Sequence, residues 1–202
     1  KTDPPPGYDG RGIAGTSVCL APRSGWAVYV LGTSLQAVYI HTRETRTLVA
    51  DFGAEGIAGA ASIAPSETHV LVPLMPSHPD IVAGKPRSGR YIDVLAAAGS
   101  AVTRYVQVPL AGGPAEVVFE DPGCTCAHSP HCPTDDDLVL IDRDRPPAFW
   151  CGGDEGRTSR CWLLRLSTGA LTEIRPRNAN RFQVHSAWTW DGRQVLYHGP
   201  LA

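Results

Sequence analysis

The sequence predicts an all-β fold, a β-propeller of four-stranded antiparallel blades, and three observations support this prediction. Glycine (21 residues) and proline (18 residues) interrupt the chain every few positions. Between them lie short runs rich in Val, Ile, Leu, Thr and Tyr, a pattern typical of strands joined by turns. A turn signal also repeats, because Ala64-Pro65 follows Ala21-Pro22 after 43 residues. An ordinary β-sandwich is the alternative, and the repeat argues against it.

The first predicted blade, residues 12–53, follows a Pro- and Gly-rich linker or loop at residues 1–11. Its alternating runs, each followed by a turn, predict four strands: Thr16 to Leu20, Trp26 to Leu31, Leu35 to His41 and Arg46 to Ala50. Four antiparallel strands in a segment of this length match one propeller blade.

Three further blades are expected at residues 54–112, 113–178 and 179–202. In the second, strands are expected at His69 to Leu74, Arg90 to Leu95 and Ala101 to Pro109. The fourth has only two strands around Asp191-Gly192, which is the strongest hairpin signal in the chain. Three and a half blades cannot close a ring, so the chain is expected to cover about four blades of a larger propeller.

Composition and charge exclude several classes of partner. The formal net charge is -2, and the 18 basic and 20 acidic residues are scattered, so no patch predicts binding to nucleic acid or to an anionic membrane. No apolar run approaches the roughly 20 residues that span a bilayer. Six cysteines in a chain of this length favour a reducing compartment over a disulfide scaffold, and we expect a cytoplasmic protein.

Three motifs, in order along the chain, carry a resemblance to a known family. They are His128-Ser129-Pro130-His131-Cys132-Pro133-Thr134-Asp135, then Asp154-Glu155-Gly156 with the strand Arg160 to Leu164, and then His185-Ser186-Ala187-Trp188-Thr189-Trp190-Asp191-Gly192. They resemble three motifs of the oligogalacturonate lyases. These are, in order, a histidine before a Phe-Ser-Pro-Thr-Asp turn, His-Glu-Gly followed by an Arg-Ile-Trp strand, and His-Glu-Phe-Trp-Thr-Pro-Asp-Gly. The resemblance implies a seven-bladed propeller with TolB-like or WD40-like repeats, of which this chain would cover the middle blades.

The resemblance also implies an activity and a cofactor. Oligogalacturonate lyases cleave short pectin-derived oligogalacturonides by metal-assisted β-elimination, with a divalent cation, typically manganese, held by histidines and a glutamine. The expected partners are therefore a small oligogalacturonide and the missing blades of the propeller. Neither the general base nor the charge-stabilising arginine can be placed by any motif.

The residues themselves suggest the metal ligands. His128 and His185 lie seven and six residues before Asp135 and Asp191, at equivalent positions of neighbouring blades. Gln183 is two residues before His185, so in a strand both side chains project to one face. Imidazole with an oxygen donor suits a borderline cation. We therefore predict His128, Gln183 and His185 as metal ligands; the alternative is that each histidine only hydrogen-bonds within its blade.

Several departures from the family motifs keep a second function open. Ser186 replaces a glutamate, Trp190 replaces the proline of the turn, and Asp154 replaces a histidine. A non-catalytic propeller that serves as a binding or interaction scaffold is therefore the alternative to the enzyme.

Three other groups of residues have competing interpretations. The segment from Cys124 to Cys132 could hold a structural zinc ion, although a second pair of ligands is missing. Trp188 and Trp190 could stack on sugars, but packing within the blades is favoured. The run Asp135 to Asp137 is interpreted as a solvated turn rather than a cation loop.

Overall fold

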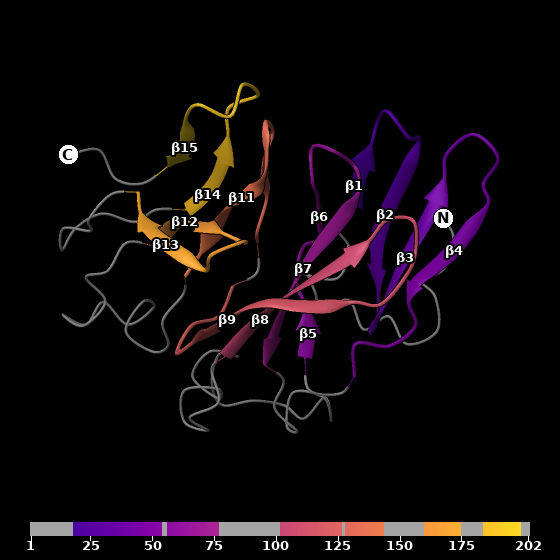
Figure 1. Ribbon diagram of the computed structural model, residues 1–202, viewed down its shortest axis with the longest axis horizontal. Coiled ribbons are helices and arrows are strands. Elements are labelled where there is room, and N and C mark those ends of the chain that lie inside the picture. Colours follow the sequence, from indigo (N-terminus) through magenta and orange to yellow (C-terminus); the bar gives the residue numbers. More distant parts are fainter. Residues whose placement is uncertain are drawn as a thin grey trace.

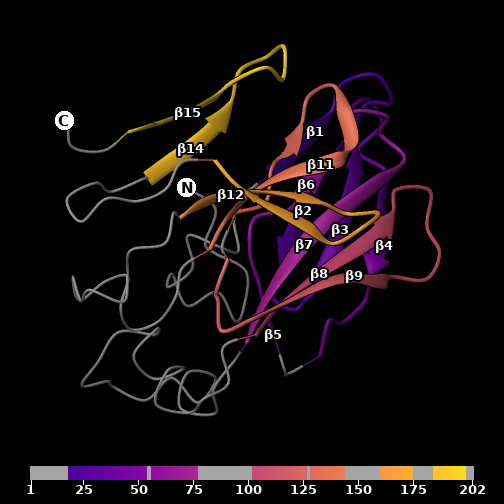
Figure 2. The ribbon, with the colours of Figure 1, turned by 60° about the vertical axis from the view of Figure 1, so that its left-hand side comes forward.

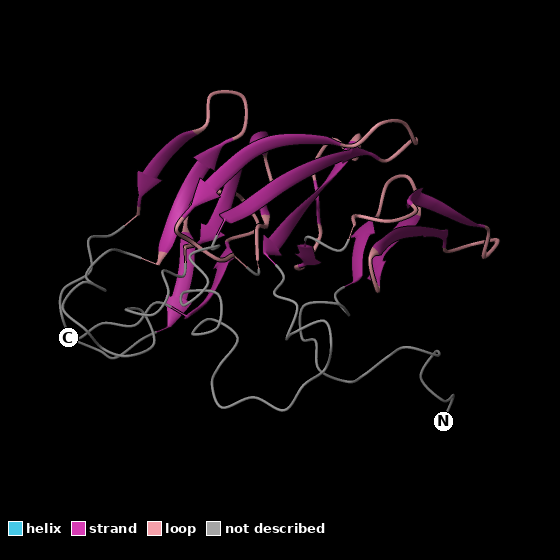
Figure 3. Cartoon of the chain, turned by 90° about the horizontal axis from the view of Figure 1, so that it is seen from below, coloured by secondary structure: helices cyan, strands magenta, loops and turns pink. Residues whose placement is uncertain are grey.

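The computed structural model describes residues 18–53, 56–76, 102–126, 128–143, 160–174 and 184–198. The expected linker at residues 1–11 lies outside these ranges. Every regular element within them is a β-strand (Figure 3). The strands form separate antiparallel sheets that follow one another side by side from β1 to β15 (Figure 1). The prediction of an all-β fold with four-stranded antiparallel sheets is confirmed.

The first sheet contains β1 to β4 in sequence order: Val18–Ala21, Trp26–Leu31, Ser34–Tyr39 and Thr45–Val49. Its strands agree with the sequence prediction to within two residues at each end. The turn between β1 and β2 requires glycine, because Gly25 has φ of 75° and a Cβ there would lie 2.8 Å from the Tyr39 ring. The glycine in this turn therefore allows β1 and β2 to pair as a hairpin.

The second sheet contains β5 to β9: Gly56–Ala58, Ser62–Ile63, His69–Pro76, Val102–Pro109 and Glu116–Pro122. Both β5 and β6 pair with β7, so the first strand of this blade is interrupted. Because β8 pairs directly with β7, it is the third strand of the blade, and β9 follows as the fourth. This sheet therefore extends past residue 112, where the sequence suggested a boundary. The strand expected at Arg90 to Leu95 lies outside the described residues.

The third sheet contains β10 to β13: His131–Cys132, Asp135–Asp142, Cys161–Arg165 and Ala170–Glu173. The hairpin expected around Asp191-Gly192 is present as β14 (Val184–Trp188) and β15 (Val195–His198). It lies at the edge of the described part of the molecule (Figure 2).

Apolar side chains fill the spaces between neighbouring sheets. One cluster lies between the first and second sheets and includes Val28, Val30, Leu35, Val70 and Val72. A second lies between the second and third sheets and includes Leu71, Tyr105, Val139, Ile141 and Leu164. Alternate residues of β7 thus enter different clusters, as the two-residue period of a strand requires. A central strand buried on both faces explains the continuous apolar run from Val70 to Leu74.

No helix in the described ranges is long and apolar enough to cross a membrane.

Candidate functional site

His128 lies at the start of the third sheet, just before β10. Its backbone forms an isolated parallel bridge with Ala60, which lies between β5 and β6 of the second sheet. The side chain is 51% exposed, and its Nδ1 is 3.5 Å from Oδ2 of Asp142. About half of the side chain is therefore open to solvent, while one ring nitrogen lies near a carboxylate.

Asp142 is the last residue of β11, and its side chain is only 4% exposed. Arg160, directly before β12, places NH1 3.2 Å from Oδ2. The Ser186 hydroxyl on β14 donates to Oδ1 at 2.9 Å. A buried carboxylate is costly unless it is paired and hydrogen-bonded, and here both oxygens have partners. Asp142 thus connects His128 to the neighbouring hairpin.

The other two predicted ligands are only partly placed. His185 belongs to β14 and is adjacent to Ser186, but its side chain lies outside the described part, as does Gln183. The β14–β15 ladder shifts between Val184 and Ala187, which marks a bulge. A bulge interrupts the strict alternation on which the shared face of Gln183 and His185 was predicted. The structure therefore brings the blade of His185 to the His128 site without testing the ligand set.

The donor chemistry around His128 fits a metal ligand. Metal-binding histidines usually direct their second ring nitrogen at a carboxylate or carbonyl, which fixes the ring. The contact with Asp142 uses Nδ1, so Nε2 is the nitrogen that could bind a cation. However, within the described ranges no group of three His, Cys, Asp or Glu side chains could hold a metal ion. A complete site would require Gln183 and His185.

The same residues do not form a Ser-His-Asp triad. In a triad the serine hydroxyl contacts the histidine, and the carboxylate contacts the other ring nitrogen. Here Ser186 donates to the carboxylate of Asp142 itself, on the oxygen opposite to the one that faces His128. The arrangement therefore orients a histidine, and it does not activate a serine nucleophile.

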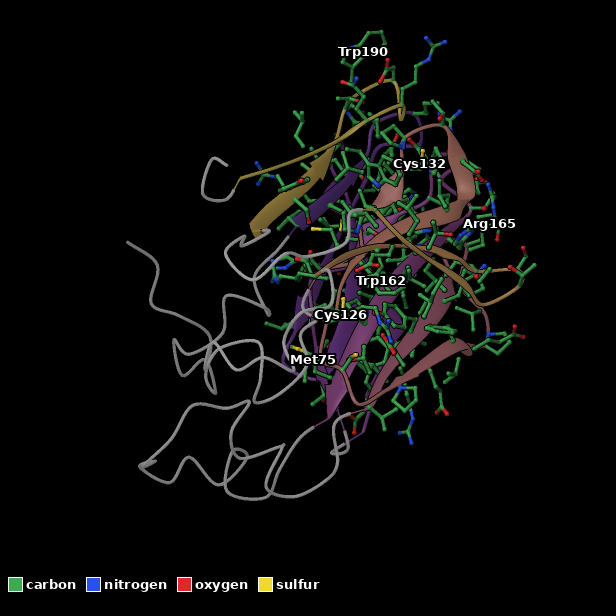
Figure 4. All side chains as sticks on the ribbon, turned by 90° about the vertical axis from the view of Figure 1, so that its left-hand side faces the viewer. Met75, Cys126, Cys132, Trp162, Arg165 and Trp190 are labelled. Carbon is green, nitrogen blue, oxygen red and sulfur yellow. The ribbon has the colours of Figure 1, made fainter. Side chains whose placement is uncertain are left out.

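The cysteines near His128 point to different partners. The Cys126 thiol donates to the His128 carbonyl at 3.0 Å, and burial raises its pKa to about 12. The Cys132 thiol lies 3.7 Å from the Gly192 carbonyl oxygen of the next sheet. Figure 4 shows these two cysteines well apart. The two thiols thus contact different carbonyl groups, and the described residues contain no group of three His, Cys, Asp or Glu side chains of the kind that a structural zinc ion requires.

The aromatic and acidic runs also have distinct positions. The Trp188 indole donates to the Pro130 carbonyl at 3.1 Å, so this ring packs between sheets as predicted. Trp190 is 89% exposed at the tip of the hairpin (Figure 4), and the packing prediction is wrong for this residue. Asp136 accepts a hydrogen bond from the Ser66 amide and Asp137 from the Ser167 amide. These carboxylates therefore bind backbone groups, but Asp135 to Asp137 are the first residues of β11, so the prediction of a solvated turn is wrong for them.

Sequence reasoning missed Asp142, Arg160 and Ser186 as members of the site. The one available signal was the position of Asp142, an acidic residue at the end of the apolar run Leu138 to Ile141. Its partners lie 18 and 44 positions further along the chain, and no local pattern predicts such contacts.

Comparison with known proteins gives matches in structure only. No family model matches the sequence, and no curated protein matches it. An oligogalacturonate lyase in complex with manganese is similar with a TM-score of 0.69 at 18% identity, over 91% of this chain and 46% of that chain. For an oligogalacturonate lyase from Vibrio parahaemolyticus the TM-score is 0.67 at 18% identity, over 87% of this chain and 44% of that chain. For an auxiliary nutrient binding protein from Bacteroides thetaiotaomicron the TM-score is 0.54 at 8% identity, over 92% of this chain and 36% of that chain.

These similarities establish the fold. The sheets are blades of a β-propeller, and the described chain is a partial propeller related in fold to the oligogalacturonate lyases. The chain spans less than half the length of each of the two lyase chains.

Proposed function

We propose that this chain is part of a metal-dependent lyase that cleaves short pectin-derived oligogalacturonides by β-elimination. The proposal is supported by the order of the three motifs and by the fold shared with two oligogalacturonate lyases. The observation that carries it is the placement of His128. Its Nδ1 faces a buried carboxylate that also accepts a hydrogen bond from Ser186, so the strand that carries His185 is held beside the blade of His128.

In this proposal His128, His185 and Gln183 hold a divalent cation, manganese by analogy with the matched lyase complex. The cation would bind the uronate carboxylate of the substrate and take up the charge that develops when the proton on C5 leaves. His128 would supply Nε2, with its ring fixed through Nδ1 by Asp142. Arg160 balances the charge of Asp142 and is itself buried, so it is not the arginine that meets the substrate.

Metal binding by the whole chain tests the proposal. The protein is stripped with a chelator, incubated with manganese, desalted and analysed for metal content. We expect about one bound ion per chain in the wild type and none in a His128→Ala, His185→Ala double variant, because two of three ligands are removed. A His41→Ala variant is the control, since His41 is exposed at the turn after β3 in the first sheet.

The outcomes distinguish the two functions. Bound manganese that is lost in the double variant supports the lyase, and digalacturonate is then assayed for the absorbance of the unsaturated product. A wild-type chain that binds no divalent metal overturns the proposal. That result would favour the scaffold, which is also consistent with the lack of a three-ligand group among the described side chains.

A further inference from the structure

We propose that Asp142 is the positioning residue of the metal site, and this inference rests on the proposed function. Asp142 would fix the His128 ring directly and would fix the strand of His185 through Ser186. It touches neither substrate nor metal in this role.

The side-chain partners of Asp142 come from three separate segments. Oδ2 faces both His128 Nδ1, at 3.5 Å, and Arg160 NH1, at 3.2 Å. Oδ1 accepts the Ser186 hydroxyl hydrogen bond at 2.9 Å. His128 precedes β10, Arg160 precedes β12 and Ser186 lies within β14, whereas Asp142 ends β11. One carboxylate therefore joins the first three strands of the third sheet to the first strand of the next.

Because Asp142 and Arg160 are buried, the contacts of Asp142 should restrain the groups that make them. The exposed fractions of the Asp142 and Arg160 side chains are 4% and 10%. The attraction between charges is stronger at such a site than in water, and each oxygen is satisfied only by its present partners. Rotation of the His128 ring would lose the contact with Oδ2, and displacement of β14 would lose the hydrogen bond to Oδ1. The carboxylate thereby opposes both movements.

A second buried pair provides a matched control. Asp121 on β9 accepts two hydrogen bonds from Arg143, at 2.7 Å each, with side-chain exposures of 1% and 10%. Like the Asp142–Arg160 pair, it is an aspartate–arginine pair between strands, but neither residue has a described contact with His128 or Ser186. Loss of Asp121 should therefore affect stability without affecting the metal site.

The experiment measures manganese affinity by electron paramagnetic resonance of the free ion, in parallel with urea unfolding. The Asp142→Asn variant should bind manganese about 10- to 100-fold more weakly, the usual effect of removing a carboxylate behind a metal-binding histidine. Ser186→Ala should weaken binding by about several-fold, because it frees only the neighbouring strand. Asp121→Asn should retain the wild-type affinity for manganese, even if this variant unfolds at a lower urea concentration.

Each outcome is informative. Wild-type affinity in both Asp142→Asn and Ser186→Ala would overturn the positioning role while leaving the proposed function intact. An equal loss of affinity in Asp121→Asn would also overturn it, because the effect would then follow stability alone. A wild-type chain without bound manganese would refute the proposed function and, with it, this inference. If Asp142→Asn does not fold, Ser186→Ala still gives the decisive comparison with Asp121→Asn.

Discussion

At the scale of single residues, His131 is buried with a neutral imidazole ring, and protonation of this ring in acid should destabilise the fold. The Ser62 hydroxyl donates to the Ser129 carbonyl at 2.6 Å, so the His131 Nδ1, 2.8 Å from the same hydroxyl, carries the proton. Its Nε2 is buried without a hydrogen-bond partner among the described residues. Burial lowers the pKa of His131 to about 4; nearby His69 also lowers it, and Asp136 partly opposes this. The folded protein therefore binds this proton less readily than the unfolded chain.

The expected consequence is a loss of stability in acid. The contribution of His131 is complete above its ordinary pKa of 6.5 and is lost as the pH falls from there towards 4. Urea unfolding at pH 7.5 and 4.5 should show that the wild type loses roughly 2 to 3 kcal/mol more than His131→Asn. Asparagine can still donate to Ser62 but does not titrate. Equal losses in both proteins would contradict the assignment.

At the scale of elements, the turns that begin successive blades contact one another. Glu67 accepts hydrogen bonds from the Arg23 and Ser24 amides, at 2.9 and 2.7 Å, and so joins the second blade to the first. Asp136 accepts a hydrogen bond from the Ser66 amide at 2.8 Å and joins the third blade to the second. At the junction between the third blade and the last hairpin, the contact is made by Gly192, whose backbone packs closely against Thr134 and Cys132. A Cβ at Gly192 would lie 2.6 Å from Thr134 Oγ1 and 2.7 Å from Cys132 Sγ.

This close approach predicts that Gly192→Ala weakens the packing of the last hairpin against the third sheet. Gly192 and Gly32 have similar φ values, 68° and 61°, but a Cβ at Gly32 would meet no atom within 4 Å. Both alanine variants should lose about 1 kcal/mol for the left-handed backbone. Only Gly192→Ala should lose about 1 to 3 kcal/mol more, from overpacking. Thermal unfolding measures the difference, and equal melting temperatures for the two variants would refute the contact.

At the scale of the whole molecule, the sequence predicted what local patterns determine. The first sheet was placed to within two residues because its turns, at Gly25 and Gly32, lie next to the strands they connect. The hairpin around Gly192 was predicted for the same reason. In the second sheet, β8 was taken for the last strand, because nothing local shows that it pairs directly with β7. His128 was singled out by its motif, whereas Asp142, Arg160 and Ser186 meet only after the sheets have packed.

Packing between sheets leads to a last prediction, at the Asp121–Arg143 pair. Arg143 follows β11, donates two hydrogen bonds to Asp121 on β9, and lies 4.7 Å from the centre of the Trp162 ring. Removing one partner leaves an uncompensated buried charge, so Asp121→Leu and Arg143→Met should each cost about 3 to 5 kcal/mol. The double variant should cost less than either single variant, because two apolar side chains can pack beside Trp162.

Urea unfolding of the two single variants and the double variant gives the coupling between the residues. The control is the Arg104–Glu120 pair on β8 and β9, whose side chains are 47% and 56% exposed. Because solvent screens this pair, Arg104→Met and Glu120→Leu should each cost below about 1 kcal/mol. If the costs of Asp121→Leu and Arg143→Met simply add in the double variant, the two side chains act independently. That result would refute the predicted coupling of Asp121 and Arg143 across the junction between the second and third sheets.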